Sequence, residues 1–175
     1  MKRVLAIADT HMKEWILPEK LSEMMENTDT IVHAGDFDLY PIYKKFNKYE
    51  LIAVAGDSDD EKIKDELPET TVFEIEGLKF GVIHKGNYIN EFHDLGYKAL
   101  ELGVDVLIFG HLHRFILEKL RRVILICPGS PTSPRLSVAS CAEIVIDGSK
   151  VDVNYHVVQP LFRGMDVLNQ LEGCR

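Results

Sequence analysis

The residues VLAIAD at positions 4–9 begin the pattern that decides the fold, a short apolar run that stops at Asp or His. The same pattern returns in TIVHAGD (30–36), LIAVAGD (51–57), FGVIH (80–84) and VDVLIFGH (104–111). Each run is long enough for a buried strand but short for a helix. We therefore expect five strands, each followed by an Asp or His side chain.

Amphipathic stretches between these runs indicate helices. Residues 18–26 have Pro near the start and apolar residues at helical spacing, and residues 41–48 are similar but shorter. Residues 90–102 give the clearest pattern, with Gly103 just past the end. Because strands alternate with helices, we expect parallel pairing in an α/β domain.

The second half of the chain is richer in strands, arranged as hairpins. Gly77 separates two strand-like stretches, and Asp147-Gly148 is a strong hairpin signal. The expected pairs are 71–76 with 79–83, 114–119 with 123–127, and 141–146 with 151–158. The elements together predict an α/β fold with a two-sheet mixed β-sandwich flanked by helices, in a single domain spanning residues 1–175.

The composition is that of a soluble globular protein, and it disfavours several functions. Of the 175 residues, 46% are hydrophobic and 27% are charged. A net charge of -8 argues against extended nucleic acid as a partner, since such binding surfaces are usually basic. No stretch reaches the roughly 18 apolar residues of a membrane helix, and three widely spaced cysteines suggest no disulfide framework. We expect a cytoplasmic protein that does not enter the membrane.

The carboxyl ends of strands are where ligands bind in α/β sheets, and five runs bring Asp or His to that edge. In an extended backbone, Asp9 and His11 should point the same way, as should His111 and His113. The candidate ligands are Asp9, His11, Asp36, Asp57, His84, His111 and His113. Seven donors are too many for one tetrahedral zinc site. They suit two divalent metals that share a bridging carboxylate, roughly 3.5–4 Å apart.

Mixed imidazole and carboxylate ligation favours transition metals over Ca or Mg. Mn, Ni, Fe, Co and Zn all fit such a donor set, and Mn is our first choice. A purely structural interpretation, with the Asp and His residues acting only as caps and turns, does not explain why five separate runs end in the same way.

In this order, the blocks resemble the calcineurin-like metallophosphoesterase superfamily, and within it the small, cap-less phosphodiesterase branch (the YfcE-like group). The family signature is D-x-H, G-D, G-N-x-D, an H from an H-G-H-like segment, and G-H-x-H. The matching blocks are Asp9-x-His11, Gly35-Asp36, Gly56-Asp57-Ser58-Asp59, His84-Lys85-Gly86 and Gly110-His111-x-His113. The tail Pro128-Gly129-Ser130-Pro131 is similar to the family's N-P-G-S stretch, so the resemblance spans residues 4 to about 135.

This resemblance implies ligand sets and an activity. The first metal would be held by Asp9, His11, Asp36 and His113, and the second by Asp36, Asp57, His84 and His111, with Asp36 bridging. The implied reaction is hydrolysis of a small phosphodiester by a metal-bridging water or hydroxide, with Asp36, Asp57 and His84 as catalytic residues. The branch also implies an open site with no cap domain, and many small relatives pair as homodimers.

Several positions depart from the family pattern or need a separate interpretation. The family usually has Asn where this chain has Asp57, and the extra negative charge should tighten cation binding and weaken the attraction for phosphate. Larger phosphatases carry a His in place of Ser58, thought to protonate the leaving group, so good leaving groups should be favoured here. Lys85, in place of a Gly, is expected to be a solvated loop lysine more than a phosphate contact. His33 lies inside an apolar run and is interpreted as a core histidine.

Two other functions fit parts of the sequence. The same fold serves as a non-catalytic, protein-binding scaffold in the retromer complex, and that scaffold also has Asp after Gly at the Asp57 position. Its first and bridging blocks depart from the family, whereas His11 and Asp36 are intact here. A metal-dependent nuclease would use the same chemistry, but only Arg121-Arg122 forms a basic cluster. The ligands do not separate diesters from monoesters; the resemblance implies diesters.

Overall fold

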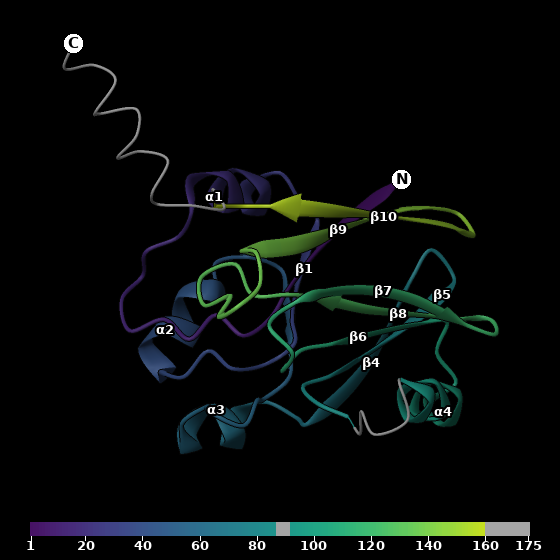
Figure 1. Cartoon of the computed structure of the whole chain (residues 1–175), viewed down its shortest axis with the longest axis horizontal. Coiled ribbons are helices and arrows are strands. Elements are labelled where there is room, and N and C mark those ends of the chain that lie inside the picture. The colour runs from purple at the N-terminus through teal and green to yellow at the C-terminus, as the bar shows by residue number, and fades with distance from the viewer. Residues whose placement is uncertain (87–91, 160–175) are drawn as a thin grey trace, which may run out of the picture.

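The computed structural model describes residues 1–86 and 92–159, and within them two five-stranded sheets pack face to face (Figure 1). The first sheet has the order β10-β9-β1-β2-β3. Its strands are β1 (Lys2–Ile7), β2 (Thr30–His33), β3 (Leu51–Ala53), β9 (Ser140–Asp147) and β10 (Lys150–Val157). β1, β2 and β3 are parallel, and β9 pairs antiparallel with both β1 and β10.

The second sheet has the order β4-β5-β6-β8-β7. Its strands are β4 (Thr70–Ile75), β5 (Leu78–Ile83), β6 (Val106–Phe109), β7 (Phe115–Leu120) and β8 (Val123–Pro128). β5, β6 and β8 are parallel, while β4 and β7 pair antiparallel at the two edges. The mixed two-sheet sandwich and all three hairpins are therefore confirmed. The five Asp- and His-ending runs do not share one sheet, however: three strands belong to the first sheet and two to the second.

Most of the apolar runs are buried on both faces, which explains why they show no alternation; Leu51 and Ile52 in the edge strand β3 are partly buried. In β1, Val4 and Ala6 face the second sheet and join a core cluster with Val82 and Ile108. Their neighbour Leu5 faces the other way, into a cluster beneath the helices. The strands thus pack between two apolar layers, and this packing fixes the positions of their carboxyl ends.

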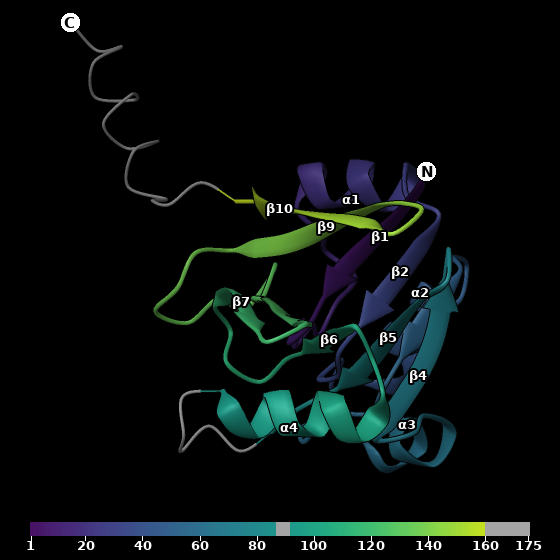
Figure 2. The same ribbon diagram turned by 90° about the vertical axis from the view of Figure 1, so that its right-hand side faces the viewer.

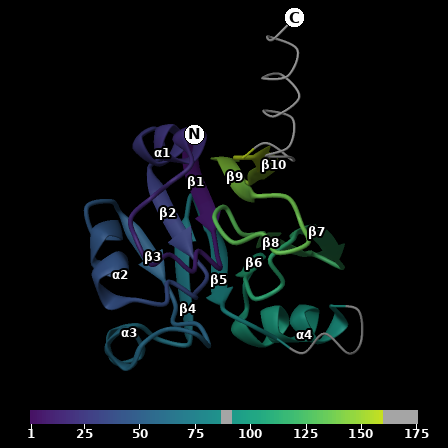
Figure 3. The same cartoon turned by 60° about the vertical axis from the view of Figure 1, so that its left-hand side comes forward.

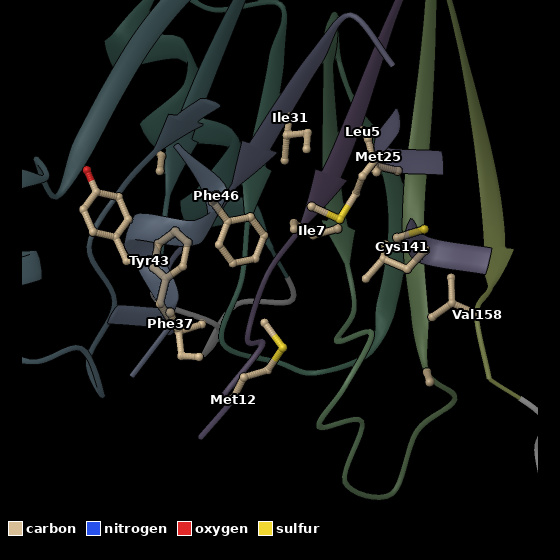
Figure 4. Packing of buried hydrophobic residues seen from close by; sticks show 14 of the residues in the cluster. Leu5, Ile7, Met12, Met25, Ile31, Phe37, Tyr43, Phe46, Cys141 and Val158 are labelled. Atoms are coloured by element: carbon tan, nitrogen blue, oxygen red, sulfur yellow. The ribbon is translucent and has the colours of Figure 1, made fainter. Parts of the chain in front are cut away.

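Helices cover the outer faces of both sheets (Figures 2 and 3). α1 (Glu19–Glu26) and α2 (Tyr40–Phe46) pack on the first sheet through the cluster shown in Figure 4, which includes Met25 and Phe46. α4 (His93–Leu102) packs on the second sheet through Leu95 and Ala99. No helix in residues 1–86 or 92–159 is long and apolar enough to cross a membrane.

The three expected helices are confirmed, but a fourth was missed. α4 ends as expected at Gly103, which adopts a left-handed conformation with φ 66; the expected start at residue 90 falls outside the described residues. α3 (Glu61–Glu66) was not predicted because it is short and buries only Ile63. Its N-cap is Asp60, whose carboxylate accepts a hydrogen bond from the Ile63 amide at 3.1 Å.

Candidate metal centre

The strand ends of the two sheets meet so closely that glycine is required at the junction. A Cβ atom on Gly56 would lie 2.2 Å from Asp36 Oδ1, and one on Gly35 would lie 2.7 Å from His84 Nδ1. Gly35 belongs to the first sheet's loops and His84 follows β5 of the second sheet. Glycine before Asp36 and Asp57 therefore lets side chains from both sheets reach the same space.

The seven candidate side chains come together in three overlapping groups, in each of which the ligand atoms lie within 4.8 Å of one another. The groups are Asp9 with His11 and His113, Asp57 with His84 and His111, and Asp9 with Asp36 and His84. Asp36 Oδ2 lies 3.4 Å from His11 Nε2 and 3.3 Å from His84 Nε2. The Asp36 carboxylate is thus placed between the first two groups.

Three buried polar atoms have no hydrogen-bond partner among the described residues, and all three belong to this centre. They are Asp9 Oδ2, His11 Nε2 and His84 Nε2. Buried polar atoms normally find partners, so such a cluster needs an explanation. A cation among these atoms would supply one, because each atom offers a lone pair to the same space.

The protein fixes the orientation of three imidazoles through their Nδ1 atoms. His84 donates to the carbonyl of Ala34 at 2.8 Å, and His113 donates to the carbonyl of Ser133 at 2.6 Å. His11 Nδ1 lies 2.7 Å from Asp38 Oδ1. With the proton on Nδ1, each neutral ring directs the bare Nε2 toward the centre, which is the tautomer that a metal ligand needs.

Burial and charge shift the proton affinities of these groups in opposite directions. Burial raises the pKa of Asp9 to about 6, although the His111 amide opposes the shift. For Asp36, burial acts in the same direction, but the proximity and charge of His84 outweigh it and lower the pKa. Burial lowers the pKa of His84, and the Asp36 carboxylate more than reverses that effect. A cluster of this kind binds a cation or protons at neutral pH.

The two outer groups differ in their access to solvent. Asp9 is 0% exposed and His113 is 2% exposed, whereas the side chains of Asp57 and His111 are 45% and 42% exposed. A cavity of about 660 Å³ lies beside the second group, and its lining includes Asp57, His84 and Lys85. The first group is therefore enclosed by protein, and the second opens toward a space that a small molecule can enter.

One geometric expectation was wrong. Asp9, His11, His111 and His113 all have positive φ values, of 53, 43, 72 and 55, so neither x-separated pair lies in extended backbone. As a result, His111 and His113 reach different groups instead of pointing the same way. Non-glycine residues in this conformation are uncommon and store strain, and such strain concentrates at functional sites.

Two carboxylates outside the seven candidate ligands, Asp38 and Asp59, support the centre. Asp38 Oδ1 contacts His11 Nδ1 and so fixes the orientation of that ring. Asp59 is 3% exposed and accepts hydrogen bonds from the amides of Asp36, Phe37, Asp38 and Gly56 at 2.6–3.2 Å. It joins the loop after β2 to the loop after β3, and so fixes the position of Asp36.

Of the two other residues interpreted from the sequence, His33 lies where it was expected, whereas Lys85 makes a contact that was not expected. His33 is fully buried, stacks on Phe37 with ring centroids 3.6 Å apart and bonds to the Gly35 amide and to Thr10 Oγ1, so it lies in the core as expected. Lys85 is exposed, but it is not simply solvated: its Nζ lies 2.8 Å from Asp57 Oδ2.

Comparison with known proteins identifies similar chains. A model of the calcineurin-like phosphoesterase superfamily domain matches residues 1–148. A "Probable metallophosphoesterase" from Methanothermobacter thermautotrophicus is 35% identical over 149 residues, which cover 83% of this chain and 87% of the relative. A phosphodiesterase from Methanocaldococcus jannaschii is 30% identical over 118 residues, 59% of this chain and 68% of that protein.

Among solved structures, wild-type Vps29 from Entamoeba histolytica in complex with zinc has a TM-score of 0.72. It is 22% identical, and the match covers 90% of this chain and 99% of Vps29. At this identity the likeness concerns the fold alone.

Proposed function

The chain belongs to the calcineurin-like phosphoesterase superfamily, and we propose that it hydrolyses small phosphodiesters with two divalent metal ions. Asp9, His11, Asp36 and His113 would hold the first ion, and Asp36, Asp57, His84 and His111 the second. The similarity to a phosphodiesterase supports the choice of diesters. Mn is our first candidate among the transition metals that suit His and carboxylate ligands.

The observation that carries this proposal is the set of buried atoms without partners, Asp9 Oδ2, His11 Nε2 and His84 Nε2. Two of these face Asp36 Oδ2 at 3.3–3.4 Å, so lone pairs converge from three directions. Lone pairs that face each other repel unless a cation or a proton lies between them. The donor set is therefore chemically matched to metal ions and not to an apolar or anionic ligand.

When bound, two such ions supply Lewis acidity at the phosphoryl oxygens and lower the pKa of a bound water. The chain's own residues would hold the ions and leave one side open to substrate. Asp36 would link the two ligand groups, with its Oδ1 held by the Ser58 amide at 2.8 Å. Asp57 and His111, the exposed members, border the side from which substrate can approach. This arrangement needs no nucleophilic side chain and no covalent intermediate.

The leaving group receives little help from the protein. Ser58 follows the Asp57 ligand, and its Oγ lies 3.4 Å from Asp36 Oδ2. A serine hydroxyl is a poor general acid at neutral pH. We therefore expect aryl esters, whose leaving groups need no protonation, to be hydrolysed faster than alkyl esters.

The proposal is tested by removing metal with a chelator and restoring Mn, Ni, Zn, Co or Mg singly. Hydrolysis of an aryl phosphodiester and an aryl phosphomonoester is measured with each ion. Metal-dependent turnover that favours the diester is expected. Asp36→Asn should lower turnover by at least about 1,000-fold, since its charge serves both ions. Asp152→Asn, a matched change on the distant strand β10, should leave turnover unaltered.

The second candidate is a protein-binding scaffold, which the fold likeness to Vps29 keeps open. The same experiment separates the two functions. Tight metal binding with no hydrolysis of either ester by any ion would favour the scaffold. Turnover that follows the metal and disappears in Asp36→Asn would exclude it.

A further inference from the structure

Lys85 and Asp57 form an ion pair at the exposed edge of the candidate metal centre. Lys85 Nζ lies 2.8 Å from Asp57 Oδ2, and the side chains are 54% and 45% exposed. The same carboxylate oxygen lies 3.4 Å from His111 Nδ1. The lysine thus contacts one of the seven candidate ligands directly.

Fold stability does not explain this pair. Exposed ion pairs contribute little to stability, because solvent screens the charges and two long side chains lose freedom. Lys85 also follows directly after His84, at the junction where both sheets deliver ligands. A positive charge at this point should oppose cation binding, so its presence needs a functional reason.

The charge balance of the centre supplies that reason. Two divalent cations bring four positive charges, and the carboxylates of Asp9, Asp36 and Asp57 bring three negative ones. Counted over the two ions and these three carboxylates alone, the charge is one net positive, and the neighbouring ammonium group of Lys85 adds a second positive charge. A phosphodiester is an anion, and its attraction to the centre increases with this net charge.

We propose that Lys85 is a positioning residue that offsets the charge of Asp57, so that the metal-loaded centre keeps its attraction for phosphate. This inference rests on the proposed two-metal function and deepens it. Lys85 acts through Asp57: its ammonium group holds the carboxylate and cancels one negative charge next to the cavity. Lys64, which donates to the Asp57 backbone carbonyl at 3.1 Å, holds the main chain of the same residue.

The test is a double-variant cycle on the full chain with Lys85→Met, Asp57→Asn and both changes together. Calorimetry measures Mn²⁺ binding, and then binding of inorganic phosphate to the Mn²⁺-loaded proteins. Lys85→Met should tighten Mn²⁺ binding and weaken phosphate binding, each about fivefold, as expected for one charge at this separation in a partly exposed site. The double variant regains the net charge of the wild type, so its phosphate affinity should return to within about twofold.

Two controls make the result specific. Lys85→Arg keeps the charge and should retain phosphate affinity. Lys150→Met breaks a matched exposed pair, Lys150 with Asp152 at 2.7 Å on β10, and should change neither affinity. All variants should unfold at the wild-type temperature, because the pair adds little to stability.

Each other outcome has a definite meaning. Unchanged Mn²⁺ and phosphate affinities in Lys85→Met would overturn the proposal and make Lys85 a solvated loop residue. A double variant as weak for phosphate as Lys85→Met would also overturn it, since Lys85 would then contact phosphate directly. Failure of the wild type to bind Mn²⁺, Ni²⁺, Zn²⁺, Co²⁺ or Mg²⁺ would instead refute the two-metal function, and this inference with it.

Discussion

The two outer ligand groups of the candidate centre are built differently. Asp9, His11 and His113, the buried half, are enclosed by protein, and the two imidazoles are held from behind by Asp38 and the Ser133 carbonyl. The open half consists of Asp57, His84 and His111: Asp57 and His111 are exposed, and Asp57 and His84 line the cavity. The open half also contains the departure from the family pattern, at Asp57, and it contacts Lys85.

We infer that the buried half serves mainly to bind its metal ion and that the open half also admits substrate. Buried ligands whose orientation is fixed bind a metal with little reorganisation, so the buried half should bind its ion more tightly. The open half leaves room for substrate. The departures from the family pattern at Asp57 and Lys85 alter the charge next to the cavity. The halves should therefore respond unequally to equivalent changes.

The largest expected difference is between Asp9→Asn and Asp57→Asn, which remove the same charge from opposite halves. We expect Asp9→Asn to weaken Mn²⁺ binding at its site by at least about 100-fold, because a buried carboxylate ligand has no substitute in its enclosed surroundings. Asp57→Asn should weaken binding only about tenfold, since the amide oxygen still ligates and water can reach the site. Calorimetric titration of both variants measures the two losses. Equal losses would show that burial does not distinguish the two metal sites.

A smaller effect is expected from Asp38, which contacts His11 and lies outside the seven candidate ligands. Asp38→Ala should weaken Mn²⁺ binding about thirtyfold in a calorimetric titration, because the His11 ring loses the partner that fixes its tautomer. Asp38→Asn retains an acceptor oxygen and serves as the conservative control, with a loss of only a few-fold. If the two variants behave alike, the hydrogen bond to His11 is not what matters.

The buried half should also be unstable without metal. Because burial raises the pKa of Asp9 to about 6, ionising Asp9 destabilises the metal-free protein above pH 6, and the penalty disappears as the pH falls toward 4. Metal-free Asp9→Asn should therefore be more stable than the metal-free wild type by about 3 kcal/mol at pH 7, and by no more than about 0.5 kcal/mol near pH 4. Urea unfolding at both pH values measures this; a gain that persists at pH 4 would point to a cause other than charge.

The smallest expected change concerns leaving-group chemistry at the open half. Ser58→His introduces an imidazole that can protonate a leaving oxygen. It should raise hydrolysis of alkyl phosphodiesters about tenfold while leaving aryl esters nearly unchanged. Rates for a series of esters with graded leaving-group pKa values measure this, and an equal gain for all of them would exclude general acid catalysis by the new side chain.

Much of the fold could be predicted because it depends on local patterns. The apolar runs, the helix before Gly103 and the hairpin at Asp147-Gly148 each carry their own signal in the sequence. α3 escaped because a helix of six residues with one buried side chain has almost no periodicity. The assignment of three runs to one sheet and two to the other depends on long-range packing, which no single run reveals.

In the candidate site too, features that depend on local sequence were predictable and features that depend on long-range packing were not. Its residue types were predictable because each follows a strand, and all seven side chains do come together. The left-handed backbone at His111 and His113 was not predictable, and for this reason the two side chains do not share the direction expected of an extended strand. The contact of Lys85 with Asp57 also joins residues from different sheets, and only the fold brings them within 2.8 Å.

We propose that the chain assembles two unequal metal sites and needs both for hydrolysis. The most direct test is one Mn²⁺ titration of the metal-free protein, in which bound ions per chain and aryl phosphodiester turnover are measured at each step. Two ions per chain with distinct affinities are expected, and turnover should rise only as the second, weaker site fills. Turnover that saturates with one ion per chain, or binding of a single ion, would show that hydrolysis does not require two metal sites.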